Sequence, residues 1–112
     1  MTELNDALSL DELNKLEAYL RENGIEYERK DEEPKTQFGV TIHFARHQIV
    51  CKDKNGKYMW DAICHPFSYG YEQGLLEIMG VLVDEEKDGD SVVGYLTADD
   101  VIKRIEEFNA PV

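Results

Sequence analysis

Basic residues are scarce in this chain: 12 Lys and Arg stand against 24 Asp and Glu among 112 residues, a net charge of −12 at pH 7. A surface so acidic repels nucleic-acid phosphates and anionic lipid headgroups, which argues against direct nucleic-acid or membrane binding. Long hydrophobic runs are also absent, since none approaches the roughly 18 residues that a membrane-spanning helix needs. Because Glu3 and Asp6 replace the basic start of a signal peptide, the sequence predicts a cytosolic location.

Cysteine is nearly absent as well, with Cys51 and Cys64 as its two representatives. They lie on either side of Asn55-Gly56, the strongest short signal for a β-hairpin turn. A turn there pairs Cys51 with Trp60 and Cys64 with His47, which leaves the two sulfurs roughly 13 Å apart along the strands. Because a disulfide needs Cα atoms within about 7 Å, we expect two free thiols and a reducing compartment.

Apolar residues make up 42% of the chain, enough for the core of a single domain over residues 1–112. The first element is a predicted helix with apolar residues at helical spacing. Ser9 and Glu12 are placed for a capping box at its start, and Leu8 and Leu13 for a hydrophobic staple across that cap. Asn23-Gly24 then supplies a left-handed stop.

The middle of the chain predicts strands. Residues 25–28 alternate as a short strand, whereas the charged segment 29–36 is expected to be a loop. Apolar residues occupy even positions in 38–44 but odd positions in the first strand of the Asn-Gly hairpin. The phase therefore slips near Ala45-Arg46, where we expect a bulge or a break.

The last third of the chain predicts two helices, the first capped by Ser68 and running to Leu82, the second starting at Thr97 with Asp100 in a capping box. The expected fold is α+β, a three-stranded antiparallel meander with helices packed on one face, in the order α-β-β-β-α-α. Its predicted core consists of Leu13, Leu16, Leu20, Ile25, Tyr27, Ile49, Cys51, Trp60, Ala62, Leu75, Ile78, Met79, Leu82, Val101, Ile105 and Phe108.

One candidate for chemistry is the predicted cross-strand pair of Cys64 and His47. A thiol beside an imidazole can form a nucleophile with its base, which makes a small Cys/His-dependent enzyme one alternative. The sequence places neither an orienting carboxylate nor an oxyanion donor next to them. A buried thiol packed beside Trp60 explains the pair without catalysis.

Metal sites are weakly indicated. His43, His47 and His65 match no zinc spacing, so no metal ligands and no cofactor are predicted. The acidic segment 84–89 resembles the start of a calcium loop, which makes a calcium-binding module a further alternative. That pattern fails at its third position, which is Glu86, and at its twelfth, which is Tyr95 in place of a bidentate Glu.

Charge is distributed unevenly along the chain. Residues 57–112 hold four bases and twelve acids, and no Lys or Arg occurs in residues 58–86. The C-terminal half therefore presents a strongly negative field, which serves either solubility or docking on a basic partner.

Three segments carry a resemblance: WDAIC at residues 60–64, SYGYEQGLLE at 68–77 and GYLTA at 94–98. With them, the C-terminal two thirds of the chain resembles a group of small, acidic, uncharacterised proteins encoded by gut Gram-positive bacteria and by their phages or mobile elements. The group has no known activity, so the resemblance assigns no catalytic residue. It implies an accessory protein of a mobile element, and small acidic inhibitors of host defence nucleases are one such class.

The leading hypothesis is a non-catalytic acidic binding protein that docks on a basic protein surface. The partner would be a nucleic-acid-binding protein in one version, in which the acidic surface imitates the charge of nucleic acid. Carboxylates would supply the charge and tyrosines the anchors, since interface energy concentrates in aromatic residues. The predicted contact residues are Asp84, Glu85, Glu86, Asp88, Asp90, Tyr69, Tyr71 and Tyr95.

Overall fold

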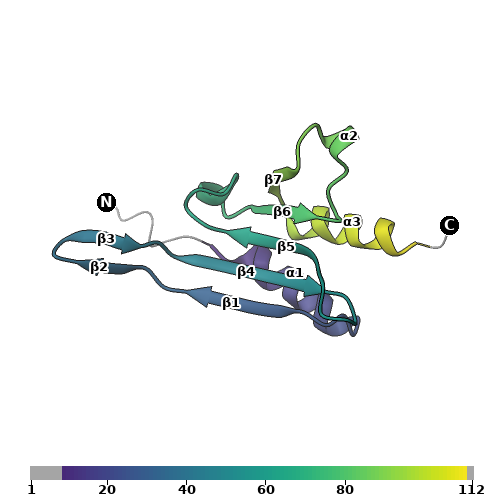
Figure 1. Cartoon of the computed structure of the whole chain (residues 1–112), viewed down its shortest axis with the longest axis horizontal. Coiled ribbons are helices and arrows are strands. Elements are labelled where there is room, and N and C mark those ends of the chain that lie inside the picture. The colour runs from purple at the N-terminus through teal and green to yellow at the C-terminus, as the bar shows by residue number, and fades with distance from the viewer. Residues whose placement is uncertain (1–8, 111–112) are drawn as a thin grey trace.

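A computed structural model describes residues 9–110, which form a mixed α+β fold around a five-stranded antiparallel sheet (Figure 1). The strand order is β1-β4-β5-β6-β7, so four consecutive strands form a meander and β1 adds to its β4 edge. The predicted three-stranded order was therefore wrong, although the α+β class and the antiparallel pairing are confirmed. The strands are β1 (Glu28–Glu32), β4 (Arg46–Lys52), β5 (Tyr58–Cys64), β6 (Leu76–Gly80) and β7 (Val92–Leu96).

Two helices, α1 (Asp11–Glu22) and α3 (Ala98–Asn109), lie side by side behind the sheet in Figure 1 and cover one of its faces. Their apolar faces meet alternate residues of the central strands, because side chains of period two on a strand point to the same face. The buried cluster consists of Leu13, Leu16, Leu20, Ile49, Cys51, Trp60, Ala62, Cys64, Leu76, Ile78, Leu82, Ala98, Val101 and Ile105.

Most of the predicted core is confirmed, with three errors. Leu75 is half-buried outside the cluster, and its neighbour Leu76 is buried in its place. Met79 is 42% exposed because β6 is a strand, in which Met79 and the buried Ile78 point to opposite faces. Phe108, in the last turn of α3, is 48% exposed. Ile25 and Tyr27 are half-buried against the cluster.

The starts of the two long helices are joined by a hydrogen bond between Ala98 and Glu12 and by the ion pair of Lys15 with Asp99. The capping box predicted at Ser9 was wrong, because Glu12 Oε1 accepts from the backbone N–H of Ala98 at 2.7 Å and caps α3 instead. Ser9 Oγ accepts from Asp11 N at 3.2 Å. The box predicted at Thr97 and Asp100 is confirmed. The predicted staple involves Leu8, which lies outside the described residues.

The helix predicted from Ser68 to Leu82 is absent. A short 3₁₀ helix η2 (Tyr71–Gln73) and the strand β6 replace it, and a single helical turn α2 (Glu85–Asp88) follows. Gly70, Gly74 and Gly80 all adopt left-handed backbone angles, with φ of 99°, 70° and 94°. A continuous helix requires negative φ at every residue, so these glycines mark turns and a strand end.

The loop predicted at residues 29–36 was also wrong, because it contains β1 and the start of a second, two-stranded sheet. That sheet pairs β2 (Lys35–Gln37) with β3 (Val40–His43) and projects beyond the main sheet (Figure 1). It lengthens the molecule to 54 Å against 28 and 22 Å along the other axes. The predicted break near Ala45-Arg46 is confirmed, since β3 ends at His43 and β4 begins at Arg46.

The hairpin of β4 and β5 has the predicted register, with Cys51 opposite Trp60 and Cys64 opposite His47. Its turn is longer than predicted: Gly56 N donates to Asp53 O, and Asp53 N donates to Lys57 O. A bulge beside Lys52 compensates for the longer turn and returns the strands to that register.

Candidate functional site

Two exposed tyrosines form the most distinctive surface feature of the C-terminal half. Tyr69 precedes η2 and Tyr95 lies in β7, and their rings stack with centroids 6.4 Å apart and an interplanar angle of 23°. They are 56% and 59% exposed. Both had been predicted as partner anchors, and the fold brings them together from positions 26 residues apart in the sequence.

The backbone that holds this tyrosine pair is strained. Tyr95 has a φ of 59°, a left-handed conformation that is rare for any residue with a bulky side chain. Its N–H donates to the carbonyl oxygen of Tyr69 at 3.2 Å, which ties the two chain segments together. Such strain costs about 1–3 kcal/mol and persists only where the surroundings enforce it.

Two glycines make this close approach of the segments possible. A Cβ at Gly94 would collide with Tyr69, whose carbonyl oxygen would lie 2.8 Å away. A Cβ at Gly70 would lie 2.9 Å from Leu75 Cβ and 3.0 Å from the backbone of Tyr95. The glycines therefore allow the two tyrosines to be held at the surface by packed backbone rather than by a free loop.

A small hollow opens beside the pair. Its volume is about 280 Å³, and its lining includes Tyr69, Tyr71, Glu72 and Tyr95. The backbone N–H of Tyr69 donates to a carboxylate oxygen of Glu77 at 2.8 Å, so a second acid supports the same segment. The site thus combines three tyrosines and Phe67 with the carboxylate of Glu72.

The acidic loop is more ordered internally than the sequence suggested. Asp84 is the N-cap of α2 and accepts from the backbone N–H groups of Glu86 and Lys87. Asp88 pairs with Arg104 of α3 through two hydrogen bonds of 2.9 and 3.0 Å. The Asp88 pKa is lowered, chiefly by the hydrogen bond from Arg104. Both carboxylates are therefore used within the fold.

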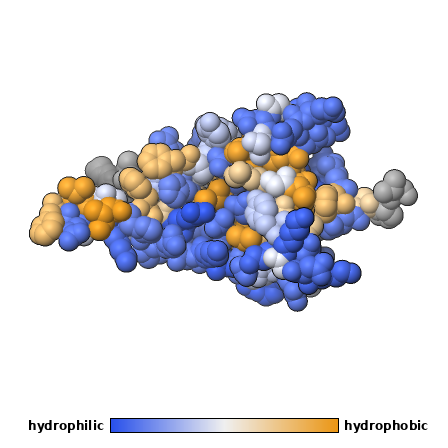
Figure 2. Space-filling model, viewed as in Figure 1, coloured by the Kyte–Doolittle hydropathy of each residue, from blue (hydrophilic) through white to orange (hydrophobic). Residues whose placement is uncertain are grey.

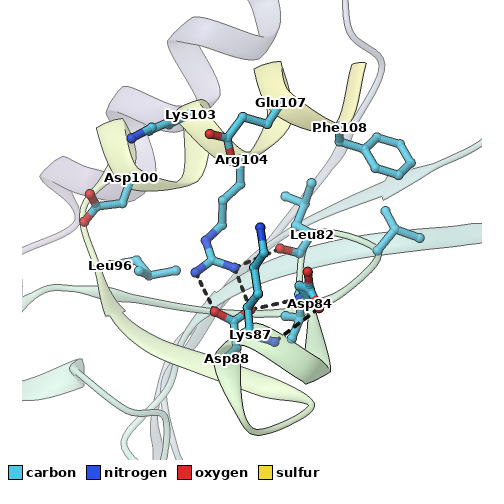
Figure 3. A pocket seen from close by; sticks show the side chains of 12 residues that line it. Leu82, Asp84, Lys87, Asp88, Leu96, Asp100, Lys103, Arg104, Glu107 and Phe108 are labelled. Atoms are coloured by element: carbon cyan, nitrogen blue, oxygen red, sulfur yellow. Dashed lines mark hydrogen bonds and ion pairs between the residues drawn. The ribbon is translucent and has the colours of Figure 1, made fainter. Parts of the chain in front are cut away.

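The Arg104 side chain extends from α3 across a cavity to α2, as Figure 3 shows. Besides its bonds to Asp88, it donates to the carbonyl oxygen of Leu82 at 3.0 Å. The cavity measures about 590 Å³ and is lined by Lys87, Lys103 and Arg104, three of the four bases in residues 57–112. The acids Asp84, Asp88, Asp100 and Glu107 line it too. Charges of both signs alternate here, so the cavity wall has no uniform negative field.

Of the predicted loop carboxylates, Glu85, Glu86 and Asp90 are left without a basic partner among the ion pairs of the described residues. Asp90 accepts from the N–H of Ser91 at 2.6 Å. All three are exposed. They belong to the α2 segment, whereas the tyrosine pair lies beside η2 and in β7.

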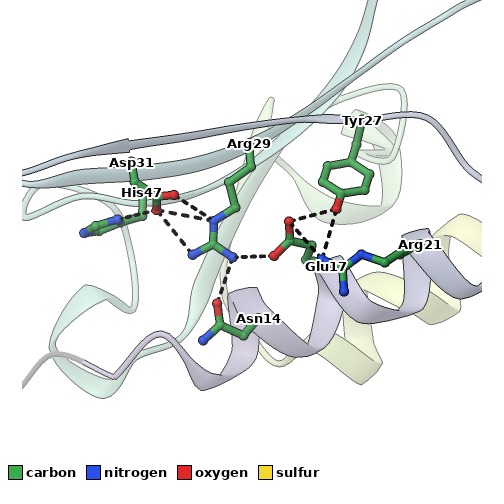
Figure 4. A network of polar contacts seen from close by, with 7 residues as sticks. All are labelled: Asn14, Glu17, Arg21, Tyr27, Arg29, Asp31 and His47. Atoms are coloured by element: carbon green, nitrogen blue, oxygen red, sulfur yellow. Dashed lines mark hydrogen bonds and ion pairs between the residues drawn. The ribbon is translucent and has the colours of Figure 1, made fainter.

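The predicted Cys64 and His47 pair is adjacent in the sheet, and the structure supplies the carboxylate that the sequence did not place. Asp31 Oδ1 lies 2.7 Å from His47 Nδ1 (Figure 4). Cys64, however, is fully buried, and its Sγ faces the carbonyl oxygen of Leu75 at 3.8 Å. Burial raises the Cys64 pKa to about 11, against a smaller opposing effect of Arg29. The thiol is thus protonated and inaccessible at neutral pH.

His47, in β4, takes part in a polar network that joins β1 to α1, and this network accounts for its contact with Asp31 without catalysis. Arg29 donates to Asp31, to Asn14 and to Glu17, and the Glu17 contact is 3.0 Å long (Figure 4). This network fastens the edge strand to the first helix. The second cysteine, Cys51, is also a free buried thiol whose pKa burial raises to about 11.

A buried carboxylate on the helix-free sheet face was missed by the sequence reasoning. Asp61 is 8% exposed and accepts hydrogen bonds from the Tyr58 hydroxyl and from Gln48 Nε2, the latter at 2.9 Å. Burial, followed by the hydrogen bond to Asp61, raises the Tyr58 pKa. An acid flanked by Trp60 and Ala62 in a strand is the sequence signal that could have pointed to it. Both Asp61 oxygens are occupied, so the group serves to join β4 to β5.

No three His, Cys, Asp or Glu side chains of residues 9–110 are arranged to hold a metal ion. In the segment that resembles a calcium loop, Asp84 and Asp88 accept from backbone N–H groups and from Arg104, which differs from the inward-facing oxygens of such a loop. Over the same residues, no helix has the length and apolarity to cross a membrane.

Comparison of this chain with protein-family models, curated proteins and solved structures found no match. The resemblance noted for residues 60–98 therefore stays a prediction. The functional reading depends on the geometry of the site itself.

Proposed function

We propose that this protein is a non-catalytic binding protein whose tyrosine pair receives an arginine-bearing segment of a basic partner protein. The observation that carries the proposal is the stacked, exposed pair of Tyr69 and Tyr95, held by a left-handed Tyr95 and by two glycines that leave no space for a Cβ. Strain of this kind concentrates at binding sites.

The chemistry of the hollow favours a guanidinium. Arginine stacks on aromatic faces, and such a cation–π contact contributes about 0.5–2 kcal/mol. Glu72, which shares the lining with the tyrosines, can neutralise the charge of that guanidinium. The volume of about 280 Å³ suits one long side chain.

The surrounding charge supports a basic partner. Residues 58–86 contain no Lys or Arg, and residues 57–112 carry a net charge of −8. Glu85, Glu86 and Asp90 contribute to the field that steers the partner, whereas Asp84 and Asp88 have structural roles. Nucleic-acid-binding proteins are a class of partner that combines many arginines with a basic surface. If this protein covers such a surface, it acts as an inhibitor of nucleic-acid binding.

The test is a titration of the ¹⁵N-labelled protein with a short peptide of alternating glycine and arginine. We expect shift changes confined to the amides of residues 67–73 and 94–96. A matched peptide with citrulline in place of arginine keeps the shape but removes the charge, and it should produce changes at least about tenfold smaller.

The double variant Tyr69→Ala and Tyr95→Ala should abolish these shift changes, while Phe108→Ala, which removes an exposed ring elsewhere, should leave them intact. Equal effects of the two peptides, or changes that map only to α2, would refute the tyrosine site. Replacing Glu85, Glu86 and Asp90 by their amides should weaken binding several-fold at low salt and have little effect at 0.3 M salt.

A further inference from the structure

The two-stranded sheet of β2 and β3 forms an arm that extends from the body of the protein (Figure 1). We use the name arm for residues 35–43. Every residue of its two strands is exposed, and among the described residues the sheet order contains no third strand on either side of it. The arm therefore offers free backbone N–H and C=O groups at both edges.

The arm also exposes large apolar side chains. Phe38, Val40 and Ile42 are 94%, 61% and 59% exposed, and Figure 2 shows hydrophobic residues gathered at that end of the molecule. Phe44 at its base contacts Phe67, with ring centroids 5.2 Å apart, so the apolar surface continues onto the body. A contiguous patch of this kind marks an interaction surface.

The turn of the arm has an unfavourable backbone conformation and an exposed aromatic ring. Phe38 and Gly39 have φ angles of 54° and 77°, the left-handed pair of a two-residue hairpin turn in which Asn-Gly is preferred. A phenylalanine here combines backbone strain with full exposure of an aromatic ring. Burial of that ring against another molecule would offset both costs.

The edge strand β1 of the main sheet differs from the arm in its residues. The edge strand β1 carries only charged residues, Glu28 to Glu32, a pattern that discourages pairing with other strands. β3 has the sequence Val-Thr-Ile-His, which consists of good strand formers and lacks an acid. Of these two strands, only β3 lacks charges that oppose strand addition.

The distribution of acidic residues indicates which kind of molecule binds the arm. Residues 34–52 contain no Asp or Glu, in a chain that has 24 of them. Two copies with a net charge of −12 each repel one another least where acids are missing. The same net charge opposes an anionic membrane. We propose that the arm is a self-association surface, through which β3 pairs antiparallel with β3 of a second copy in a two-fold symmetric dimer.

The available area is adequate for such a dimer. At 150–250 Å² for a whole aromatic side chain, the exposed fractions of Phe38, Phe44 and Phe67 correspond to on the order of 400 Å² per chain. Val40 and Ile42 add to it, so the pair of chains reaches the roughly 1,000 Å² that a specific interface needs. A two-fold axis places the same patch on both chains, and strand pairing satisfies the free β3 edge.

The experiment is sedimentation equilibrium of the full chain over a wide concentration range, at 20 and 300 mM salt. We expect a monomer–dimer equilibrium that tightens as salt rises, because salt screens the repulsion between like-charged chains. Ile42→Lys should weaken the dimer roughly 100-fold, as loss of a central interface residue does. The matched control Val81→Lys, at a position 44% exposed on the body, should leave it unchanged.

At a concentration at which the wild type is monomeric, circular dichroism should show that both variants keep the wild-type melting temperature, since both positions are exposed. A protein that remains monomeric up to 200 µM contradicts the proposal, as does a dimer that Ile42→Lys leaves intact. A monomer that floats with phosphatidylglycerol vesicles and is released by salt would assign the arm to a membrane and also overturn it.

Discussion

Asp31 shows how single side chains acquire their roles in this fold. Its carboxylate accepts from His47 and from Arg29, two residues that lie in different strands (Figure 4). Burial works to raise the Asp31 pKa, but the hydrogen bonds from His47 and Arg29 outweigh that effect and the pKa is lowered. Asp31, His47 and Cys64 are thus arranged like the acid, base and nucleophile of a catalytic triad. Asp31 and His47, however, take part in the polar network that joins β1 to α1.

The reactivity of the cysteines tests this interpretation directly. Both thiols are buried, with pKa values raised to about 11, so almost no thiolate is present at pH 7.5. We expect iodoacetamide to leave Cys51 and Cys64 unmodified in the native protein and to label both in 6 M urea, as measured by intact mass. Rapid native labelling of Cys64 would revive the enzyme alternative.

Among the elements, α2 depends most on a single tertiary contact. A helix of four residues is not stable alone, and its C-terminal residue Asp88 is tied to α3 by the bidentate pair with Arg104. The side chains of Asp88 and Arg104 are 15% and 25% exposed, so water screens their attraction only in part. We call this ion pair of Asp88 and Arg104 the clasp, because it holds α2 against α3.

Breaking the clasp should destabilise the protein measurably. Asp88→Asn removes the charge and leaves Arg104 partly buried without its anion, at an expected cost of about 1–3 kcal/mol in the free energy of unfolding measured with urea. The matched change Asp99→Asn disrupts an exposed pair with Lys15 and should cost less than about 0.5 kcal/mol. Equal effects of the two substitutions would show that α2 is held by other contacts.

For the whole molecule, the acidic surface makes stability dependent on pH. Asp31, Asp88 and Asp100 all have lowered pKa values in the folded state. For Asp100 the main cause is hydrogen bonding to the backbone and side chain of Thr97 in the capping box. A carboxyl with a depressed folded pKa stabilises the fold above its unfolded pKa of about 3.9, and that stabilisation is lost as pH falls through the folded pKa.

The corresponding prediction compares wild type with Asp31→Asn. The difference in their free energies of unfolding should shrink progressively below pH 4, because the wild-type carboxylate then takes up its proton. Urea titrations at pH 7, 5, 4 and 3 measure it. Thr41→Ala, an exposed and non-ionisable change, should show a difference that does not vary with pH. An Asp31→Asn difference that persists unchanged at pH 3 would contradict the lowered pKa.

Local patterns predicted the parts of the fold that local physics decides. The hairpin register follows from the turn at residues 53–57 and from the alternation of apolar residues in the two flanking strands. The turn is longer than the predicted two residues, but the bulge beside Lys52 restores the predicted pairing. The helix starting after Thr97 follows from its capping box and apolar spacing. Charge and aromatic content predict Tyr69 and Tyr95 as contact residues, but they do not predict that the two rings stack.

Tertiary structure decided what sequence periodicity leaves ambiguous. Residues 76–80 contain apolar residues that fit a helix or a strand, and pairing with β5 and β7 selected the strand. The charged residues of β1 resemble a loop, yet β4 pairs with them, because an edge strand needs only one hydrogen-bonded neighbour and tolerates water on its other side. Pairing of the acids with Arg29 and Arg104, and the meeting of Tyr69 with Tyr95, also require contacts between segments far apart in the chain. The residues determined which chemistry is available, and the packing of distant segments determined which of it is free to act.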